Sequence, residues 1–161
     1  MKFEETLLPE KSDVKTLQNM IRKYNRQNFE AANQTDFAIY IKDDNEDGMG
    51  GISGEIFGNW MDVDYLVIHE SLRRKGLGRE LLKKAEDLAI RNNCKNIFLN
   101  TLDFQGKDFY PKFGFEEVYV KRQYPLTGTE HFFVKKLSNE IDKETGEIPE
   151  EAEWCDERTD N

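Results

Sequence analysis

Apolar residues recur at helical spacing in two segments of the chain. In the first segment they are three or four residues apart: Val14, Leu17, Ile21 and Tyr24. This spacing predicts an amphipathic helix, with Ser12 or Asp13 as its N-cap. In the second segment the apolar positions again share one helical face: Leu77, Leu81, Leu82, Ala85, Leu88 and Ala89. This helix should begin near Gly78 and end at Asn92 and Asn93.

Short apolar runs separated by turn residues predict strands. The runs cover residues 37–41, 52–57, 61–68, 96–101, 116–121 and 131–137. Antiparallel hairpins are predicted at two turns, the turn-rich residues 43–51 and the pair Gly58 and Asn59. Residues 107–112 predict a short helix that stops near Gly114. The resulting order predicts one mixed α/β (α+β) domain, with a mixed, mostly antiparallel central sheet flanked by helices.

The negative charge is concentrated at one end of the chain. Residues 139–161 hold ten acidic and two basic residues, which is −8 of the net charge of −9. We therefore expect a folded domain over residues 1–138 and an acidic tail over residues 139–161 that is disordered or loosely docked. Trp154 suggests the alternative that the tail is anchored to the body or to a partner. A tail of this charge argues against nucleic-acid binding.

The chain has few features of a secreted, membrane or metal-binding protein. Cys94 and Cys155 are the only cysteines, so a disulfide framework is not expected. No apolar run approaches the roughly 20 residues of a membrane helix. The first residues lack the apolar stretch of a signal peptide, and no cluster has metal-ligand spacing. These features predict a cytoplasmic protein with no membrane partner and no metal.

The most informative motif lies between the apolar run 65–68 and the second helix. Residues 73–79 read Arg-Arg-Lys-Gly-Leu-Gly-Arg. Two glycines allow the backbone close to a ligand, and a helix start offers unpaired N–H groups and a partial positive charge. The segment therefore predicts a site for a polyphosphate, such as the pyrophosphate of a nucleotide-like cofactor. The alternative is a solvated basic turn.

Two common glycine-rich motifs do not fit this segment. A dinucleotide fingerprint needs Gly or Ala where this chain has Leu81, and a P-loop ends in Gly-Lys-Ser/Thr. The segment does match Arg/Gln-x-x-Gly-x-Gly/Ala, which resembles the acetyl-CoA signature of the GNAT superfamily of N-acetyltransferases. The resemblance implies that the loop holds the pyrophosphate, and that Leu66 and Ile68 bind the pantetheine arm through main-chain atoms. The predicted cofactor-binding loop is Arg73, Arg74, Lys75, Gly76, Leu77, Gly78 and Arg79.

A second motif is similar to another signature of the same family. Residues 108–115 read Asp-Phe-Tyr-Pro-Lys-Phe-Gly-Phe. In the family this Tyr lies near the cofactor sulfur and can protonate the leaving thiolate, a role that Tyr110 inherits. The alternative is a core aromatic with a satisfied hydroxyl. Many members carry Asn and Ala where this chain has Asp103 and Gly106, so the contact of that Asn to the pantetheine is not carried over.

The proton acceptor is expected among acids of the strand before the loop. Asp62 and Asp64 alternate along residues 61–68 and should share a face with Leu66 and Ile68. Asp64 is the preferred base, because it is nearer the expected acetyl site, with Asp62 and Glu55 as reserves. Asp64 could instead be a surface acid or an anchor for the substrate amine. His69 and His131 are further alternatives, because histidine titrates near neutral pH.

The resemblance implies acetyl-CoA as cosubstrate and direct transfer of its acetyl group to a primary amine. The acids near the expected amine site favour a cationic small molecule as the acceptor. Two alternatives stay open: a protein lysine or N-terminus as acceptor, and a non-catalytic CoA-binding regulatory module. A homodimer through the C-terminal strands is a further expectation, with Phe132 and Phe133 in the contact.

Overall fold

The computed structural model describes residues 2–30 and 34–137, which fall into two compact units divided after Gln34. In the first unit, α1 (Lys11–Arg26) is the predicted amphipathic helix. Its N-cap is Glu10, and no side chain caps it. The predicted caps, Ser12 and Asp13, are wrong because the helix begins at Lys11 and includes both. The predicted tail, with Trp154, lies outside the described residues.

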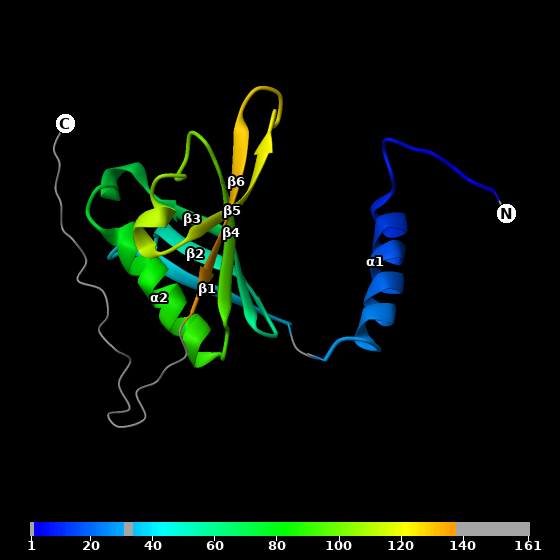
Figure 1. The fold of residues 1–161 in the computed structure, drawn as a ribbon, viewed down its shortest axis with the longest axis horizontal. Helices are drawn as coiled ribbons and strands as arrows, with labels where there is room; N and C mark the ends of the chain where they lie inside the picture. Colours follow the sequence, from blue (N-terminus) through cyan, green and yellow to red (C-terminus); the bar gives the residue numbers. More distant parts are fainter. Residues whose placement is uncertain (1, 31–33, 138–161) are drawn as a thin grey trace. The chain divides into compact units, whose positions relative to one another are not determined.

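The second unit is built on a six-stranded sheet (Figure 1). Its strands are β1 (Gln34–Lys42), β2 (Gly48–Phe57), β3 (Trp60–Ile68), β4 (Asn96–Leu102), β5 (Glu116–Arg122) and β6 (Thr129–Lys136). The spatial order is β1-β2-β3-β4-β6-β5. β3 and β4 are parallel, whereas the pairs β2–β3, β4–β6 and β5–β6 are antiparallel. The mixed, mostly antiparallel sheet is therefore confirmed.

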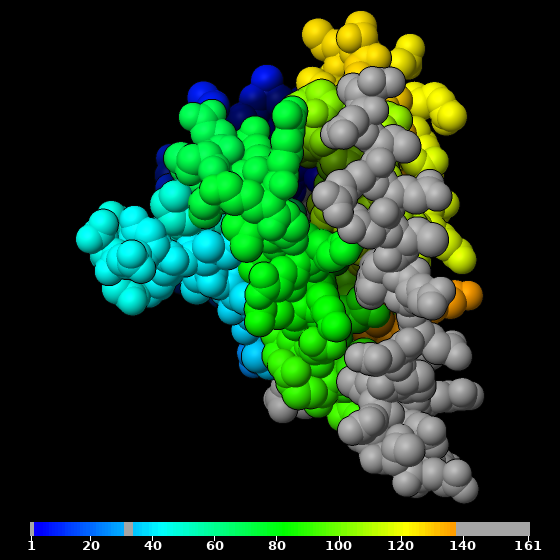
Figure 2. Space-filling model, turned by 90° about the vertical axis from the view of Figure 1, so that its left-hand side faces the viewer, coloured from blue at the N-terminus to red at the C-terminus, as the bar shows by residue number. Residues whose placement is uncertain are grey.

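The parallel pair requires a crossover, and α2 (Leu77–Arg91) provides it. This helix buries Leu81, Leu82, Ala85 and Ala89 against one face of the sheet. The sheet supplies the other half of the core: Ile52, Met61, Val63, Ile97, Leu99 and Phe133. Figure 2 faces this side of the molecule, where α2 (green) runs along the surface and the β1–β2 turn (cyan) projects from it.

Three predictions about local structure differ from the observed elements. The predicted turn over residues 43–51 ends earlier, because β2 begins at Gly48 and Gly50 pairs with Ile68. The short helix predicted over residues 107–112 is a four-residue 3-10 helix, η2 (Tyr110–Phe113). Phe133 is 1% exposed and packs in the core, so its side chain is not available on the surface for the expected dimer contact, and the homodimer stays a prediction.

β3 contains one extra residue relative to β2. Val63 lies opposite Gly54 and Tyr65 lies opposite Ser53, so Asp64 forms a β-bulge between them. Gly54 permits this close approach, because a Cβ there would lie 1.9 Å from the Asp62 carbonyl oxygen. The bulge shifts the alternation of β3, and this shift decides which side chains share a face.

Among the described residues, no helix has the length and apolar composition needed to cross a membrane.

Candidate active site

The site begins where β3 and β4 separate. Their ladder ends at the pair Val63 and Leu99, although β3 continues to Ile68 and β4 to Leu102. Beyond Val63, β3 stays paired with β2, with Leu66 opposite Ile52. One backbone edge of β3 therefore has no ladder partner on β4 over the stretch that holds Leu66 and Ile68. Such an edge offers N–H and C=O groups to an extended ligand.

The glycine loop follows directly from this open strand. After β3 comes a 3-10 turn, η1 (Glu70–Leu72), and the Nε of Arg73 donates to the Ile68 carbonyl at 3.2 Å. Gly76 has φ +80°, a left-handed conformation that favours glycine, and it is the N-cap of α2. The predicted loop therefore connects the open strand to the start of the helix.

Two features of the loop bear on the prediction that it binds a diphosphate. A Cβ on Gly76 would meet no atom within 4 Å, and one on Gly78 would meet only the Phe109 ring, at 3.5 Å. The backbone is thus accessible on this side. The first N–H groups of α2 have no acceptor within the helix, and the helix dipole adds positive potential. Four cationic side chains flank these groups: Arg73, Arg74, Lys75 and Arg79.

Tyr110 lies within the core on the α2 side of the sheet. It is 8% exposed and packs against the rings of Phe109, Phe115 and Phe133. Burial raises the pKa of its hydroxyl above the ordinary value of 10.0. Across residues 34–137 this hydroxyl forms no hydrogen bond with another protein group. A buried tyrosine hydroxyl usually has a partner, so this one suits a ligand group beside it.

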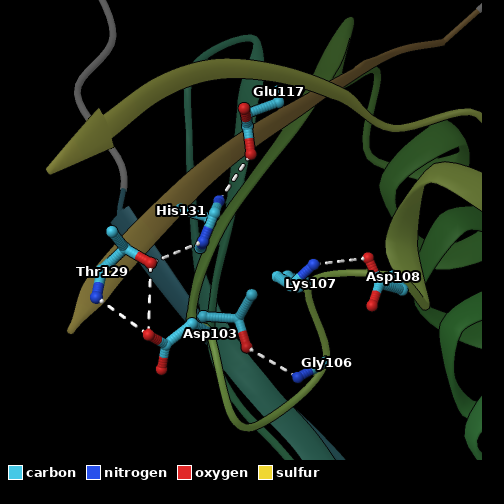
Figure 3. Close-up of polar contacts among 8 residues, drawn as sticks. Asp103, Gly106, Lys107, Asp108, Glu117, Thr129 and His131 are labelled. Atoms are coloured by element: carbon cyan, nitrogen blue, oxygen red, sulfur yellow. Dashed lines mark hydrogen bonds and ion pairs between the residues drawn. The ribbon is translucent and has the colours of Figure 1, made fainter. Parts of the chain in front are cut away.

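Asp103 and Gly106, where this chain departs from the resembling family, have local structural roles. The Asp103 carboxylate accepts hydrogen bonds from the Thr129 backbone N–H at 3.1 Å and from its hydroxyl at 3.3 Å. The carboxylate therefore joins the end of β4 to the start of β6 (Figure 3). At Gly106 a Cβ would lie 3.2 Å from the Tyr110 ring. Glycine here leaves room for that ring.

The two histidines considered as bases are both engaged in local contacts. His131 contacts Glu117 through Nδ1 at 2.6 Å and Thr129 through Nε2 at 3.0 Å (Figure 3). His69 accepts a hydrogen bond from the Ser71 backbone N–H at 3.4 Å and thereby caps η1. Sequence reasoning did not find the His131 contacts, because they depend on the register of β5 against β6.

Glu55, Asp62 and Asp64 are neighbours, but Asp62 does not lie on the predicted face. Met61 and Val63 face α2, so the alternating side chain of Asp62 points to the opposite side of the sheet. After the bulge, Leu66 and Ile68 pack against the core on the α2 side. The prediction that Asp62 shares a face with these two residues is therefore wrong. The cause is the extra residue at position 64.

Asp62 is in an unfavourable environment for a carboxylate. Burial raises its pKa above the ordinary value of 3.8, and the negative charges of Glu55 and Asp64 raise it further. Glu55 lies directly opposite Asp62 on the neighbouring antiparallel strand. Like charges placed opposite each other destabilise a sheet, so the fold carries an electrostatic cost at this point.

Asp62→Asn should increase thermal stability at pH 7. Because the pKa of Asp62 is raised in the folded state, ionisation at higher pH costs stability, and an amide removes that cost. The side chain is only partly buried, so we expect a rise in Tm of about 1–3 °C. The difference should shrink as the pH falls through the ordinary pKa of about 3.9, because the carboxyl then becomes protonated in the unfolded state as well. Thermal unfolding at pH 7 and pH 3.5 measures this, and an equal shift at both values would contradict it.

Comparison with known proteins identifies the family. Residues 2–115 match the model of the "Acetyltransferase (GNAT) family". An acetyltransferase of Agrobacterium fabrum is 26% identical over 65% of this chain and 76% of its own. The blasticidin-S acetyltransferase of Streptomyces morookaense is 31% identical over 63% of this chain and 75% of its own.

Solved structures of acetyltransferases also resemble this chain. An acetyltransferase from Bacillus cereus has a TM-score of 0.76 at 26% identity, covering 83% of this chain and 98% of its own. A putative acetyltransferase from Agrobacterium tumefaciens has a TM-score of 0.79 at 22% identity, covering 85% and 100%, and supports the fold. The chain therefore belongs to the GNAT family of acetyltransferases and is an N-acetyltransferase that uses acetyl-CoA.

Proposed function

We propose that this enzyme transfers an acetyl group directly from acetyl-CoA to a primary amine of a cationic small molecule. The observation that carries the proposal is the group of acids Glu55, Asp62 and Asp64, which lies beside the separation of β3 and β4. A cationic acceptor would relieve the repulsion among these carboxylates. The name of the Streptomyces relative, blasticidin-S acetyltransferase, is in line with a small-molecule acceptor.

The arrangement of the strands suggests how the two substrates meet. The glycine loop and Tyr110 lie on the α2 side, whereas Asp62 points to the other side. Acetyl-CoA supplies an activated acetyl thioester. The main-chain groups of Leu66 and Ile68 would hold its pantetheine arm along the open edge of β3, and the loop Arg73–Arg79 would hold its diphosphate. The amine would then approach from the face that carries the acids.

The proposed roles balance the protons of the transfer. Asp64 accepts a proton from the amine, directly or through water, as the new C–N bond forms. The Tyr110 hydroxyl donates its proton to the sulfur as the C–S bond breaks. Exchange with solvent then restores both groups. The products are an amide and a free thiol, and no acyl-enzyme is needed. We further propose residues 1–138 as the acetyltransferase domain and the cytoplasm as its compartment.

Thiol release with a panel of amines tests the acceptor class. Cationic amines such as spermidine should be turned over, and neutral arylamines should not. Asp64→Asn should lower kcat/KM for the cationic amine about 100-fold, while acetyl-CoA binding measured by calorimetry stays within about twofold. Asp44→Asn, which removes the same charge from the exposed β1–β2 turn, is the matched control. Preferred turnover of arylamines, or full activity of Asp64→Asn, would contradict the proposal.

A further inference from the structure

A pocket of about 390 Å³ lies near the acids, on the sheet face that points away from α2. Five side chains from β2, β3 and β4 line it: Glu55, Phe57, Trp60, Asp62 and Phe98. Their sequence neighbours Ile56, Met61 and Ile97 face the core on the α2 side. By strand alternation the pocket residues point to the opposite side. The pocket is thus formed by the sheet itself.

The pocket combines two kinds of groups that recognise organic cations. Glu55 and Asp62 place two carboxylates side by side, and each neighbouring charge that raises the pKa of Asp62 is another carboxylate. The walls are aromatic, and Trp60 is 42% exposed. Aromatic faces attract ammonium and guanidinium groups, with Trp the most effective. A hydrated metal ion would gain nothing from three aromatic walls, so this lining favours an organic cation.

The pocket is separated from the place of acetyl transfer. Asp62 belongs to the paired part of β3, whereas Leu66 belongs to the open part. At about 3.3 Å per residue, their Cα atoms are roughly 13 Å apart along the strand. One amino group cannot occupy the pocket and also reach an acetyl group held beside Leu66. A cation in the pocket would therefore be a different group from the amine that receives the acetyl group.

We propose that this pocket binds a second cationic group of the acceptor, which makes the substrate class a dication. Its two charges are roughly 7–13 Å apart, the span from Asp62 to Asp64 and to Leu66 along the strand. This inference rests on the proposed function and names its substrate class more narrowly. Glu55 and Asp62 pair with the remote cation, Trp60 packs against it, and the primary amine at the other end reaches Asp64. The pocket would thus favour acceptors that carry a positive charge at both ends and whose charges are far enough apart to reach both sites.

Three amines distinguish the effect of a second charge at the right distance from the effects of chain length and of total charge. In 1,8-diaminooctane nine bonds join the nitrogens and span about 11 Å. In 8-amino-1-octanol a neutral hydroxyl replaces one ammonium at the same length. In 1,3-diaminopropane both charges are present but too close to span the two sites. We expect kcat/KM for 1,8-diaminooctane to exceed that of the other two by about tenfold or more, which is the effect of one charge-assisted contact.

Variants of the pocket test whether it causes that preference. The double variant Glu55→Gln/Asp62→Asn should reduce the ratio of kcat/KM between 1,8-diaminooctane and 8-amino-1-octanol to near one. Trp60→Leu should lower the same ratio and provides a second, independent change. The control is Asp44→Asn/Glu116→Gln, which removes two exposed charges elsewhere and should keep the wild-type ratio. Circular dichroism and Tm check that each variant is folded.

The outcomes distinguish this inference from the proposed function. A wild-type preference for 1,8-diaminooctane that the pocket variants lose supports the inference. Turnover of all three amines with equal kcat/KM, or a preference that both pocket variants keep, overturns it and leaves acetyl transfer to amines intact. No turnover of any cationic amine by a protein that binds acetyl-CoA overturns the proposed function, and the inference falls with it.

Discussion

Gly78→Glu should strongly weaken acetyl-CoA binding without unfolding the protein. Gly78 lies in the first turn of α2, and a Cβ there meets only the Phe109 ring at an ordinary 3.5 Å. A carboxylate at this position favours the helix, because Glu has a better helix propensity than Gly and a negative charge near an N-terminus is stabilising. The same charge would repel the diphosphate. We expect the Kd for acetyl-CoA to rise at least about 100-fold, measured by calorimetry, with Tm unchanged or higher.

Gly78→Ala is the control that separates charge from size. The family pattern accepts Ala at this position, and the methyl group has room beside Phe109. We expect acetyl-CoA affinity within about threefold of wild type and a small gain in stability from the loss of a helical glycine. If Gly78→Glu binds acetyl-CoA as wild type does, the loop does not hold the diphosphate. The segment would then be a basic turn, and the cofactor would have to bind elsewhere.

The parts of the fold that the sequence predicted are those with a strong local signal. The face of α2 repeats apolar residues at helical spacing, and Leu81, Leu82, Ala85 and Ala89 are buried accordingly. The loop was also predictable, because Gly76 must adopt a conformation that other residues rarely take. In both cases a few neighbouring residues carry the whole signal. A resemblance to a known family could therefore be recognised from short motifs.

The parts that were missed depend on contacts between distant segments. The bulge at Asp64 follows from the close approach of Gly54 on another strand, and no local pattern in β3 marks it. It reverses the faces of the residues that follow, so strict alternation gave the wrong partners for Asp62. The contacts of Asp103 with Thr129 likewise need the pairing of β4 with β6. Register errors of one residue are enough to misplace such side chains.

Tyr110→Phe should lower kcat about 100-fold while acetyl-CoA affinity stays within about twofold of wild type. Removal of the hydroxyl takes away the proton for the departing sulfur, a contribution of this size for a general acid. Tm should change little, because across residues 34–137 the hydroxyl has no hydrogen-bond partner to lose. Single-turnover thiol release measures the rate and calorimetry the affinity. Tyr119→Phe, at a residue 60% exposed on β5, is the matched control and should retain wild-type kcat.

The raised pKa of Tyr110 determines the protonation state of its hydroxyl at neutral pH. Because burial raises that pKa above 10.0, the hydroxyl is protonated throughout the neutral range and can serve as a donor without prior activation. A loss of wild-type kcat between pH 8 and pH 9 would thus have to come from another group, and the same loss should persist in Tyr110→Phe. An unchanged kcat in Tyr110→Phe would make Tyr110 a core aromatic and leave protonation of the thiolate to solvent. A lower affinity with an unchanged kcat would instead assign the hydroxyl to cofactor binding.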